Sequence, residues 1–431
     1  MHAKVGKLPG KKSKFYLDKI KALNLGWNEP YPFVHSEKGQ GCYFQDIDGN
    51  VFLDFASQIA SNPLGYNHPD LLEVVKKYSK RHPVKFAGQD FTVKEHVELL
   101  EELVKITPQG LDKAFLINSG AEAVENAIKV ALRYKKTAKY AVSFEFGWHG
   151  RTLGALSCTN SKAVQKNNFF SLPVKRIPFS TEALNKLERL ILSEGDIDNI
   201  GFVIMEVVQG EGGYNIAPER MIKEIRAVTR EKYIPLIIDE VQSGLGRTGK
   251  WFACEHFGVK PDILTASKAL QVGATISSKK FDLEPGSISS TWGGGHILDL
   301  AIGLETIRII KRDKLLEKNK EHGDYLKKRL KELEHENNSI TRVRGLGLMV
   351  AFDLPTKELR DSAVLEFLKS GLVTVGCGIS GVRLIPPYVV TKKEIDQAMD
   401  IIEKSLKSCC KVNFKQEGEI CKYINCGETS S

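Results

Sequence analysis

The sequence predicts an α/β fold, with a large domain built on a mostly parallel sheet with flanking helices and a second, smaller α+β unit. From about residue 113 to residue 268, short apolar runs alternate with stretches of helical periodicity. Continuous apolar runs between helices are typical of strands that are buried on both faces of a parallel sheet. The length of 431 residues suits one large and one smaller domain.

The N-terminal part predicts a hairpin and a helix. The first 40 residues are turn-rich, with Pro30, Pro32 and Gly39 punctuating them. Two alternating apolar runs then flank Asp48-Gly49-Asn50, which predicts a strand, a tight turn and a second strand. Residues 91–106 have helical spacing of their apolar residues, which are Val97, Leu99, Leu100, Leu103 and Val104.

The central part supplies the strands of the predicted parallel sheet and the helices between them. The strand candidates are residues 114–117, 141–146, 202–208, 235–241 and 262–267. The helical segments are residues 121–136, 182–195 and 219–232.

After a long helix near residues 297–319, the chain changes to a smaller α+β pattern. Strands are expected around Val343–Phe352 and Gly381–Ile385, and helices at 359–369 and 392–407. We expect the N-terminal segment to pack with this part as the small domain. The predicted division is 1–70 and 321–408 for the small domain, 71–320 for the large domain, and 409–431 for a cysteine-containing tail.

Composition and charge exclude several classes of protein. Hydrophobic residues make up 42% and charged residues 27%, which is ordinary for a soluble globular protein. The formal charge is +9, but Lys and Glu alternate in stretches such as KKRLKELEHE, so we expect a solvated face and no nucleic-acid site. No apolar run reaches membrane-spanning length, and the basic N-terminus lacks the apolar core of a secretory signal. A cytoplasmic location without membrane contact is therefore expected.

The eight cysteines fall into two groups. Cys42, Cys158, Cys254 and Cys377 are isolated in apolar or glycine-rich surroundings, as reduced packing cysteines are. The spacing CC-x10-C-x4-C in the tail matches no common zinc pattern, so a loose polar tail is predicted and no metal site. A metal-binding or redox role is the alternative for the tail cysteines, Cys409, Cys410, Cys421 and Cys426.

Two features at predicted strand ends suit a flat anionic ligand, because ligands of open α/β sheets collect at the carboxyl ends of the strands. Ser119-Gly120-Ala121 lies between a strand and a helix, where free backbone N–H groups can bind a phosphate. A plain helix cap by Ser119 is the alternative. In GWHGRT, two glycines leave Trp148 able to cover a ring and Arg151 able to point into a cleft; a core aromatic beside a surface arginine is the alternative.

Two further features are an acid and a lysine. Asp239 ends the apolar run PLIID, and a carboxylate there is costly to bury without a cationic partner such as a protonated ring nitrogen. Its alternative role is to cap the loop after the strand. Lys268 follows the next strand, DILTAS, where a lysine can lose its proton and attack an aldehyde. The four features together meet the requirements of pyridoxal phosphate.

At these motifs the chain resembles the class III aminotransferases, which are fold-type-I pyridoxal-phosphate enzymes. The shared landmarks run in order from about residue 35 to 405 and include NSGAEAVENAIKVA, GWHGRT, EVVQGEGG, the block from IIDEVQSG to ILTASK, and STWGGG. The segment LVTVGCGISGVRLIPP most resembles the branch with 4-aminobutyrate and lysine 6-aminotransferases. The resemblance implies a large domain with a seven-stranded type of sheet.

The resemblance also implies roles for individual residues. Lys268 and Asp239 would be catalytic, with Lys268 bound to the cofactor as an imine and Asp239 on its ring nitrogen. The remaining cofactor-binding residues would be Ser119, Gly120, Ala121, Trp148, His149, Glu206, Val241, Gln242 and, from the partner subunit of a homodimer with shared active sites, Thr291.

The substrate-binding residues implied by the resemblance are Ile59, Arg151, Glu211 and Arg383. Arg151 would bind the distal carboxylate of an ω-amino donor. Glu211 would mask Arg383 until 2-oxoglutarate arrives, when Arg383 would take its α-carboxylate; a fixed structural ion pair is the alternative.

Two departures from the family pattern bear on the substrate. Glu206 is followed by Val207 where the family commonly has proline, and ALQVGATISSKK after Lys268 lacks the usual glycine-rich run. The expected reaction moves an amino group from 4-aminobutyrate, the lysine ε-amine or the ornithine δ-amine to 2-oxoglutarate, with N-acetylornithine less favoured. A racemase or aminomutase on the same scaffold is the nearest alternative, and a non-catalytic cofactor-binding protein is a more distant one.

Overall fold

The computed structural model describes residues 2–26, 31–160, 165–193, 197–336 and 340–409. These residues form two compact units: unit 1 contains residues 2–69 and 318–409, and unit 2 contains residues 70–317. None of the described helices is both long enough and apolar enough to cross a membrane.

Unit 2 is built on a seven-stranded sheet, which confirms the predicted mostly parallel architecture. The strand order is β4-β10-β9-β8-β7-β5-β6, and β10 runs in the direction opposite to the other six strands. The strands are β4 (Lys113–Ile117), β5 (Tyr140–Phe144), β6 (Val174–Ile177), β7 (Ile200–Glu206), β8 (Leu236–Asp239), β9 (Ile263–Ala266) and β10 (Gly273–Ser277).

Two of these strands are absent from the sequence-based prediction. The edge strand β6 reads VKRI, and its charged residues interrupt the apolar run that marks a buried strand. The strand β10 reads GATIS, and all five residues are buried. Only its alanine and isoleucine have aliphatic side chains, so the sequence shows no apolar run there. Small residues fit there because Gly273 lies against the backbone of Ser119, where an added methyl group would come within 2.2 Å of the carbonyl oxygen.

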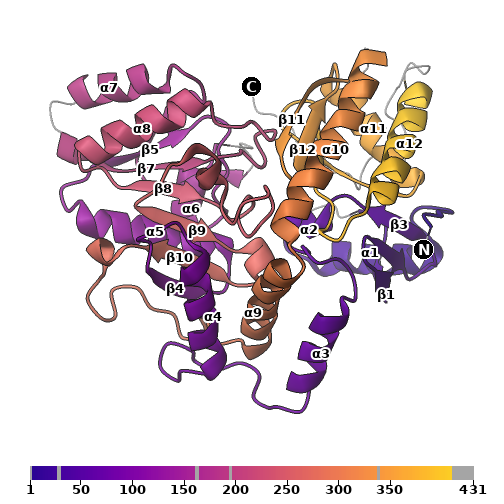
Figure 1. Cartoon of the computed structure of the whole chain (residues 1–431), viewed down its shortest axis with the longest axis horizontal. Helices are drawn as coiled ribbons and strands as arrows, with labels where there is room; N and C mark the ends of the chain where they lie inside the picture. Colours follow the sequence, from indigo (N-terminus) through magenta and orange to yellow (C-terminus); the bar gives the residue numbers. More distant parts are fainter. Residues whose placement is uncertain (1, 27–30, 161–164, 194–196, 337–339, 410–431) are drawn as a thin grey trace. The chain divides into compact units, whose positions relative to one another are not determined.

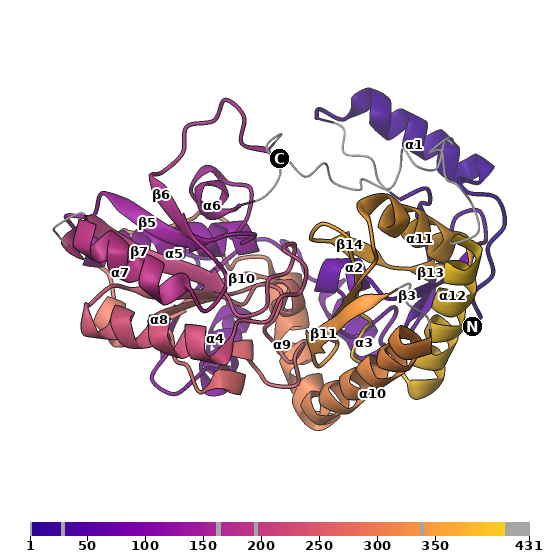
Figure 2. The ribbon, with the colours of Figure 1, turned by 90° about the horizontal axis from the view of Figure 1, so that it is seen from above.

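In unit 2, helices pack against the sheet and against other helices. Helix α5 contacts β9, β10 and β7, while α7 and α8 lie side by side along the sheet (Figures 1 and 2). Apolar residues of α5 and α6 meet strand residues such as Phe202, Ile204 and Ile237 in one buried core. The helices are α3 (Pro69–Tyr78), α4 (Lys94–Ile106), α5 (Gly120–Tyr134), α6 (Leu153–Cys158), α7 (Ala183–Ser193), α8 (Glu219–Glu231) and α9 (Ile297–Arg312), with short 3-10 helices at Ile197–Asn199, Ala253–Phe257, Lys268–Leu270 and Lys279–Phe281.

The single helix predicted near residues 297–319 is two helices. Helix α9 ends at Arg312, and α10 (Leu315–Glu336) begins three residues later. Lys314 between them has a φ of 53°, in the left-handed region. The sequence carries no glycine or proline at this break, so the helical periodicity predicted one continuous helix.

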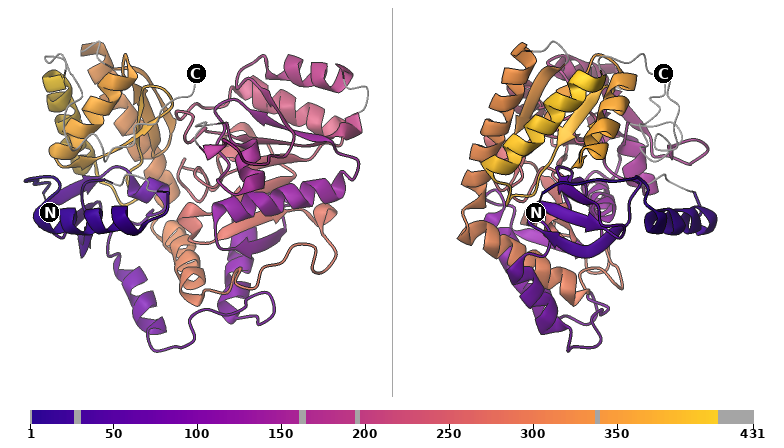
Figure 3. Two further views of the ribbon diagram at one scale, coloured as in Figure 1. Left: turned by 180° about the vertical axis from the view of Figure 1, so that it is seen from behind. Right: turned by 90° about the vertical axis from the view of Figure 1, so that its right-hand side faces the viewer.

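Unit 1 contains two four-stranded sheets, with orders β1-β2-β3-β13 and β11-β12-β15-β14. The predicted hairpin around Asp48-Gly49-Asn50 is confirmed as β2 and β3, and β3 pairs in parallel with β13 from the C-terminal part. Helices α11 and α12 lie side by side, and α11 contacts both sheets (Figure 3). The elements are α1 (Lys11–Leu23), β1 (His35–Gln40), β2 (Tyr43–Asp46), β3 (Val51–Asp54), β11 (Thr341–Leu346), β12 (Met349–Asp353), α11 (Lys357–Lys369), β13 (Leu372–Val373), β14 (Val375–Cys377), β15 (Gly381–Leu384) and α12 (Lys392–Cys409).

Helix α1 lies in the segment for which only turns were predicted. Its first turn is held by a distant residue, because the carboxylate of Asp48 accepts hydrogen bonds from the backbone N–H groups of Lys12 and Ser13, both at 2.8 Å. Such a cap replaces the usual N-cap side chain and leaves no local signal in the sequence.

A left-handed turn follows β3 in unit 1. The segment labelled α2 (Ser57–Ala60) has φ values of 45°, 52°, 57° and 67° at its four residues. None of them is glycine, and the left-handed conformation costs about 1–2 kcal/mol for each such residue. Asp54 opposes this cost, because one carboxylate oxygen accepts the backbone N–H groups of Ala56 and Ser57 at 2.8 Å, and the Tyr66 hydroxyl donates to the other.

Four of the predicted packing cysteines are described, and all four are buried, namely Cys42, Cys158, Cys254 and Cys377. Of the tail, Cys409 ends α12, while Cys410, Cys421 and Cys426 lie outside the described residues. The loose-tail prediction and its metal-binding or redox alternative therefore both remain predictions.

Candidate active site

Three predicted site residues meet at the carboxyl ends of neighbouring parallel strands in unit 2. Glu206 ends β7 and Asp239 ends β8, and these two residues are direct partners in the sheet register. Lys268 lies just beyond the end of β9, the next strand, as the first residue of a 3-10 helix. The fold therefore gathers two carboxylates and a lysine at the edge where α/β sheets bind their ligands.

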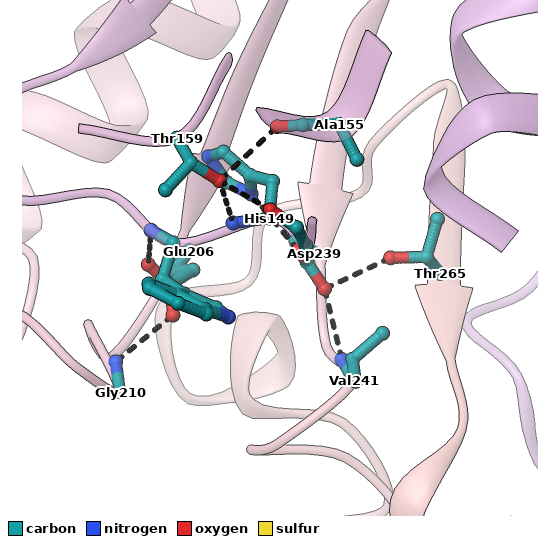
Figure 4. A network of polar contacts seen from close by, with 10 residues as sticks. His149, Ala155, Thr159, Glu206, Gly210, Asp239, Val241 and Thr265 are labelled. Carbon is teal, nitrogen blue, oxygen red and sulfur yellow. Dashed lines mark hydrogen bonds and ion pairs between the residues drawn. The ribbon is translucent and has the colours of Figure 1, made fainter. Parts of the chain in front are cut away.

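Asp239 is buried and fully oriented by hydrogen bonds (Figure 4). Its Oδ1 accepts the backbone N–H of Val241 and the hydroxyl of Thr265, each at 3.0 Å. Its Oδ2 lies 2.9 Å from Nδ1 of His149. No lysine or arginine among the described residues forms an ion pair with Asp239, and the group that lies against its Oδ2 is the imidazole of His149.

His149 lies behind the carboxylate and is itself held in place. Its backbone N–H donates to the Thr159 hydroxyl at 2.9 Å, and that hydroxyl lies 3.1 Å from the carbonyl oxygens of Gly150 and Ala155 (Figure 4). The His149 Nε2 atom is buried and has no hydrogen-bond partner among the described residues. The contact between Nδ1 and the Asp239 carboxylate therefore orients both side chains.

The start of α5 forms a tight cradle beside these strand ends. Ser119 is the N-cap of α5: its Oγ accepts the Glu122 N–H at 3.3 Å and lies 2.8 Å from the Glu122 carboxylate. Ser119 is therefore a helix cap, as its alternative interpretation anticipated. It leaves the N–H groups of the first helical turn directed outward, so the phosphate contact stays a prediction.

Gly120 shows how closely the cradle and the strand ends approach. A methyl group added to Gly120 would lie 2.7 Å from Cγ1 of Val241 and 3.3 Å from Cβ of Ser267, the residue before Lys268. Gly150 has a φ of 131°, and its added methyl group would lie 2.8 Å from Cβ of Ala121. Glycine is therefore required where the helix start, the loop after Asp239 and the lysine connection converge.

Trp148 and Arg151 lie together in the loop that follows β5. The Arg151 guanidinium carbon is 5.0 Å from the centroid of the Trp148 ring, which is a cation–π contact. Arg151 is exposed, and no carboxylate among the described residues forms an ion pair with it. The side chain is thus placed to accept an anion from solution beside a flat aromatic face.

Glu206 joins two loops. Its Oε2 accepts the backbone N–H of Trp148 at 2.8 Å, and its Oε1 accepts that of Gly210 at 2.9 Å (Figure 4). Burial raises the pKa of Glu206 to about 7; His149 opposes this rise and Asp239 adds to it. A carboxylate with a pKa near neutrality at a strand end is typical of functional sites.

The remaining predicted cofactor-binding residues of unit 2 are Gln242, Lys268 and Thr291. The Gln242 Oε1 accepts a hydrogen bond from the Tyr214 hydroxyl at 2.9 Å. Lys268 is half-buried, and its carbonyl oxygen accepts both the backbone N–H of Gln271, at 3.2 Å, and its side-chain Nε2, at 2.9 Å. Thr291 lies in an exposed loop, and its predicted role at the phosphate of a partner subunit remains a prediction.

The predicted substrate residues are divided between the units. Arg151 and Glu211 belong to unit 2, whereas Ile59 and Arg383 belong to unit 1. Ile59 is 42% exposed in the left-handed turn, and Arg383 is buried on β15, paired with Ala351 of β12 and Val375 of β14. The Glu211–Arg383 switch therefore remains a prediction, as does its alternative of a fixed ion pair.

Three residues of this site were not anticipated from the sequence. Thr265 and Thr159 orient Asp239 and His149, and Gly210 donates to Glu206. Thr265 had a usable signal, because it is the polar residue in the buried strand ILTA. The other two lie in loops and carried none.

No group of histidine, cysteine, aspartate and glutamate among the described residues is arranged to hold a metal ion. The donors and acceptors at the strand ends suit an organic ligand with one anionic end and a protonated ring instead.

Comparison with known proteins agrees with this chemistry. Residues 26–406 match the family model for class III aminotransferases. Acetylornithine aminotransferase of Archaeoglobus fulgidus is 37% identical over 377 residues, covering 85% of this chain and 94% of the relative. The [LysW]-aminoadipate semialdehyde transaminase of Deinococcus radiodurans is 36% identical over 393 residues, covering 88% and 87%.

Solved structures give the same result. Lysine aminotransferase from M. tuberculosis superposes with a TM-score of 0.85 at 26% identity, covering 92% of this chain and 99% of that one. Ornithine aminotransferase from Toxoplasma gondii has a TM-score of 0.83 at 27% identity, covering 93% and 96%. The chain therefore belongs to the class III aminotransferases, enzymes that use pyridoxal phosphate as their cofactor.

Proposed function

We propose that this aminotransferase moves an amino group from the end of an ω-amino donor to 2-oxoglutarate, and that Lys268 and Asp239 carry the reaction. The observation that supports this most is the position of Asp239, a buried carboxylate oriented on one oxygen by Thr265 and Val241 and on the other by His149. It lies one strand away from Lys268 at the same edge of the sheet.

The described residues fit pyridoxal phosphate. Backbone N–H groups at the start of α5 suit its phosphate, the face of Trp148 suits its ring, and Asp239 suits its protonated nitrogen. When bound, this cofactor supplies an aldehyde that condenses with amines and a ring that accepts electrons from the substrate carbon.

Each residue then has one task. Asp239 keeps a negative charge beside the ring nitrogen, and His149 holds the carboxylate in that orientation. Lys268 would use its Nζ to move the proton from the substrate carbon that bears the amine to the cofactor carbon C4′, so that the donor could leave as a carbonyl compound and the amino group stay with the cofactor. Arg151 binds the carboxylate at the far end of the donor, which aligns the amine with Lys268.

The donor class follows from the relatives and from the chemistry of the site. The names acetylornithine, lysine and ornithine aminotransferase all describe donors with a primary amine far from the α-carboxylate. The sequence alone favoured N-acetylornithine less than the other donors. With these relatives, we rank N-acetylornithine, lysine and ornithine as the first candidate donors and 4-aminobutyrate after them. The proposed acceptor is 2-oxoglutarate, and the proposed active form is a homodimer in which Thr291 reaches the partner's phosphate site.

A donor panel tests this proposal. The purified enzyme, loaded with pyridoxal phosphate, is mixed with 2-oxoglutarate and with N-acetylornithine, lysine, ornithine, 4-aminobutyrate or alanine, and glutamate is measured. At least one ω-amino donor should exceed alanine by about a hundredfold in kcat/KM, because a bound distal carboxylate contributes several kcal/mol to alignment. Glutamate formation from alanine alone would contradict the ω-amino proposal.

Incubation with a donor and no 2-oxo acid tests the racemase or aminomutase alternative. An aminotransferase stops after one turnover because the amino group stays on the cofactor, whereas a racemase or mutase continues. The transaminase names of both reported relatives favour the first outcome.

A further inference from the structure

Two loops of unit 2 that carry predicted site residues meet at the end of β7. The Trp148 loop (residues 145–152) follows β5 and carries Trp148, His149 and Arg151. The Gly210 loop (residues 207–215) follows β7 and carries Glu211. Each loop needs a fixed position, because one presents the aromatic face and the other the acid of the predicted switch.

Glu206 is the residue that touches both loops through the backbone. One carboxylate oxygen accepts the N–H of Trp148 at 2.8 Å, and the other accepts the N–H of Gly210 at 2.9 Å. A second hydrogen bond also joins the two loops: Gln209 Nε2 donates to the carbonyl oxygen of Glu145 at 2.6 Å. A methyl group added to Gly212 would lie 2.5 Å from the Phe146 carbonyl oxygen. The two loops therefore lie in direct contact.

The partner of Glu206 in the sheet register is Asp239, and this pairing has a consequence for the Trp148 loop. Glu206 holds the backbone of Trp148, while Asp239 lies 2.9 Å from the side chain of His149, the next residue. Two neighbouring strand-end carboxylates thus hold two consecutive residues. The backbone of Trp148 and the side chain of His149 are thus attached to adjacent strand ends.

The backbone that Glu206 holds also lies beside Gln242, a predicted cofactor-binding residue. A methyl group added to Gly210 would lie 3.0 Å from Nε2 of Gln242, so the backbone that Glu206 holds lies against Gln242. Gln242 in turn accepts a hydrogen bond from Tyr214, the penultimate residue of the Gly210 loop. Displacement of Gly210 would therefore move the surroundings of Gln242 as well.

We propose that Glu206 is a positioning residue that couples the Trp148 loop to the Gly210 loop, so that the aromatic face and the Glu211 side of the site adopt one joint arrangement. This inference rests on the proposed roles of Trp148 and Glu211. It differs from a direct cofactor contact, because both carboxylate oxygens are committed to backbone N–H groups. Burial of a carboxylate is costly, and the two backbone donors offset part of that cost.

Glutamine at this position is the informative change. A carboxylate offers an acceptor oxygen to each loop, whereas the glutamine amide has one acceptor oxygen and an NH₂ group that would face an N–H donor. Glu206→Gln therefore keeps the size of the side chain but directly removes the acceptor of one loop. Because the proposal couples the two loops, the other loop should loosen as well. Glu206→Ala removes both acceptors and serves as the second variant.

Glu240 offers a matched control. It is also a fully buried carboxylate at the end of β8 with a pKa raised to about 7 by burial, and it accepts two backbone N–H groups, from Ala253 at 2.9 Å and Cys254 at 2.8 Å. Its partners belong to no predicted part of the site. Glu240→Gln should therefore perturb folding stability to a similar degree without disturbing the two loops.

The test is residue-resolved hydrogen exchange of the full chain without cofactor, so that its outcome is independent of which donor the enzyme uses. In the wild type, the amides of Trp148 and Gly210 should exchange more slowly than the intrinsic rates of an unfolded chain, because both donate to Glu206. In Glu206→Gln and Glu206→Ala, both amides should exchange about tenfold faster or more, as expected for loss of a charge-assisted hydrogen bond. Glu240→Gln should leave both unchanged.

A second measurement follows the cofactor itself. Titration of each apoprotein with pyridoxal phosphate should give a Kd about tenfold higher for Glu206→Gln and an unchanged Kd for Glu240→Gln. The proposal is overturned if the two wild-type amides are unprotected, or if Glu206→Gln accelerates only one of them. It is also overturned if Glu240→Gln produces the same changes.

Discussion

The carboxyl edge of the unit 2 sheet and the left-handed turn of unit 1 position predicted site residues in opposite ways. At the sheet edge, Glu206 and Asp239 end regular strands, and hydrogen bonds satisfy each carboxylate oxygen. In the turn, four non-glycine residues, Ile59 among them, adopt a conformation that costs energy and that Asp54 helps to maintain. The contrast shows that one protein can position predicted site residues both by unstrained strand ends and by a strained turn. The sheet edge and the turn should therefore respond differently to mutation and pH.

The largest effect is expected from Lys268 at the sheet edge. Lys268→Ala removes the amine that moves the proton, so kcat should fall by about four orders of magnitude or more while pyridoxal phosphate still binds without a covalent bond. Borohydride reduction of the wild type followed by peptide mapping should place the cofactor on Lys268. Lys279→Ala, at an exposed lysine after β10, is the control and should be unaffected. A label on any other lysine would disprove the assignment.

The next largest effect is expected from Asp239. Asp239→Asn keeps the shape but removes the buried negative charge, and loss of one partner of a buried charge pair costs about 3–5 kcal/mol. Turnover should therefore fall by about two to three orders of magnitude, measured as kcat/KM with the preferred donor. Thr265→Val removes only one hydrogen bond to the same carboxylate, and we expect a loss of about fivefold. Equal losses in the two variants would show that charge is not what matters at this position.

The sheet edge should also respond to pH, through Glu206. Its pKa is raised from 4.5 to about 7 in the folded protein, so folding favours the protonated form. This stabilisation is complete below about pH 4.5 and is lost as the pH rises through 7, when the folded protein must hold a buried anion beside Asp239 and His149. A shift of this size corresponds to about 3 kcal/mol.

Urea unfolding at pH 5.5 and pH 8.5 measures this effect. Glutamine does not titrate, so Glu206→Gln should be more destabilised relative to the wild type at pH 5.5 than at pH 8.5. Glu102 is the control: hydrogen bonds from Lys105 and Lys311 lower its pKa to about 2, so the effect of Glu102→Gln should be the same at both pH values. A pH-independent effect of Glu206→Gln would contradict the raised pKa.

The smallest effect is expected in the left-handed turn, and its sign is opposite. Ile59→Gly removes the strain of a β-branched residue with a φ of 57°, whereas Ile59→Ala removes the side chain but keeps a Cβ atom. The glycine variant should be more stable than the alanine variant by about 1 kcal/mol at both pH values, as measured by urea unfolding. Both variants should raise KM for the donor if Ile59 contacts the substrate. A glycine variant that is no more stable than the alanine variant would show that the turn is not strained.

The sequence predicted the relaxed part of the molecule better than the strained part. Strand-end positions of Asp239 and Lys268 follow from apolar runs that stop at a polar residue, a pattern visible in PLIID and DILTASK. The partners of those residues did not follow: His149 lies 90 positions from Asp239, and only the folded sheet brings the two together. The strands β6 and β10 were missed because charged or small residues break the apolar signal.

The left-handed turn was beyond sequence reasoning for a physical reason. Ser57, Gln58, Ile59 and Ala60 include neither glycine nor asparagine, the residues that mark such a conformation. What holds them is a set of hydrogen bonds from Asp54 and Tyr66, which depend on the completed unit. Likewise, α1 is capped by Asp48 from outside the helix, so its start left no local trace.

The single reversed strand of the large sheet has a consequence for the lysine. Because β10 runs back along β9, residues 267–272 form a short connection whose two ends are anchored in adjacent strands of the same sheet. In its proposed role, Lys268 would therefore need to move only its side chain, while the short connection holds its main chain in place. A lysine that must release and rebind its partner in every catalytic cycle benefits from a short, anchored connection, because its amine then returns to the same position each time.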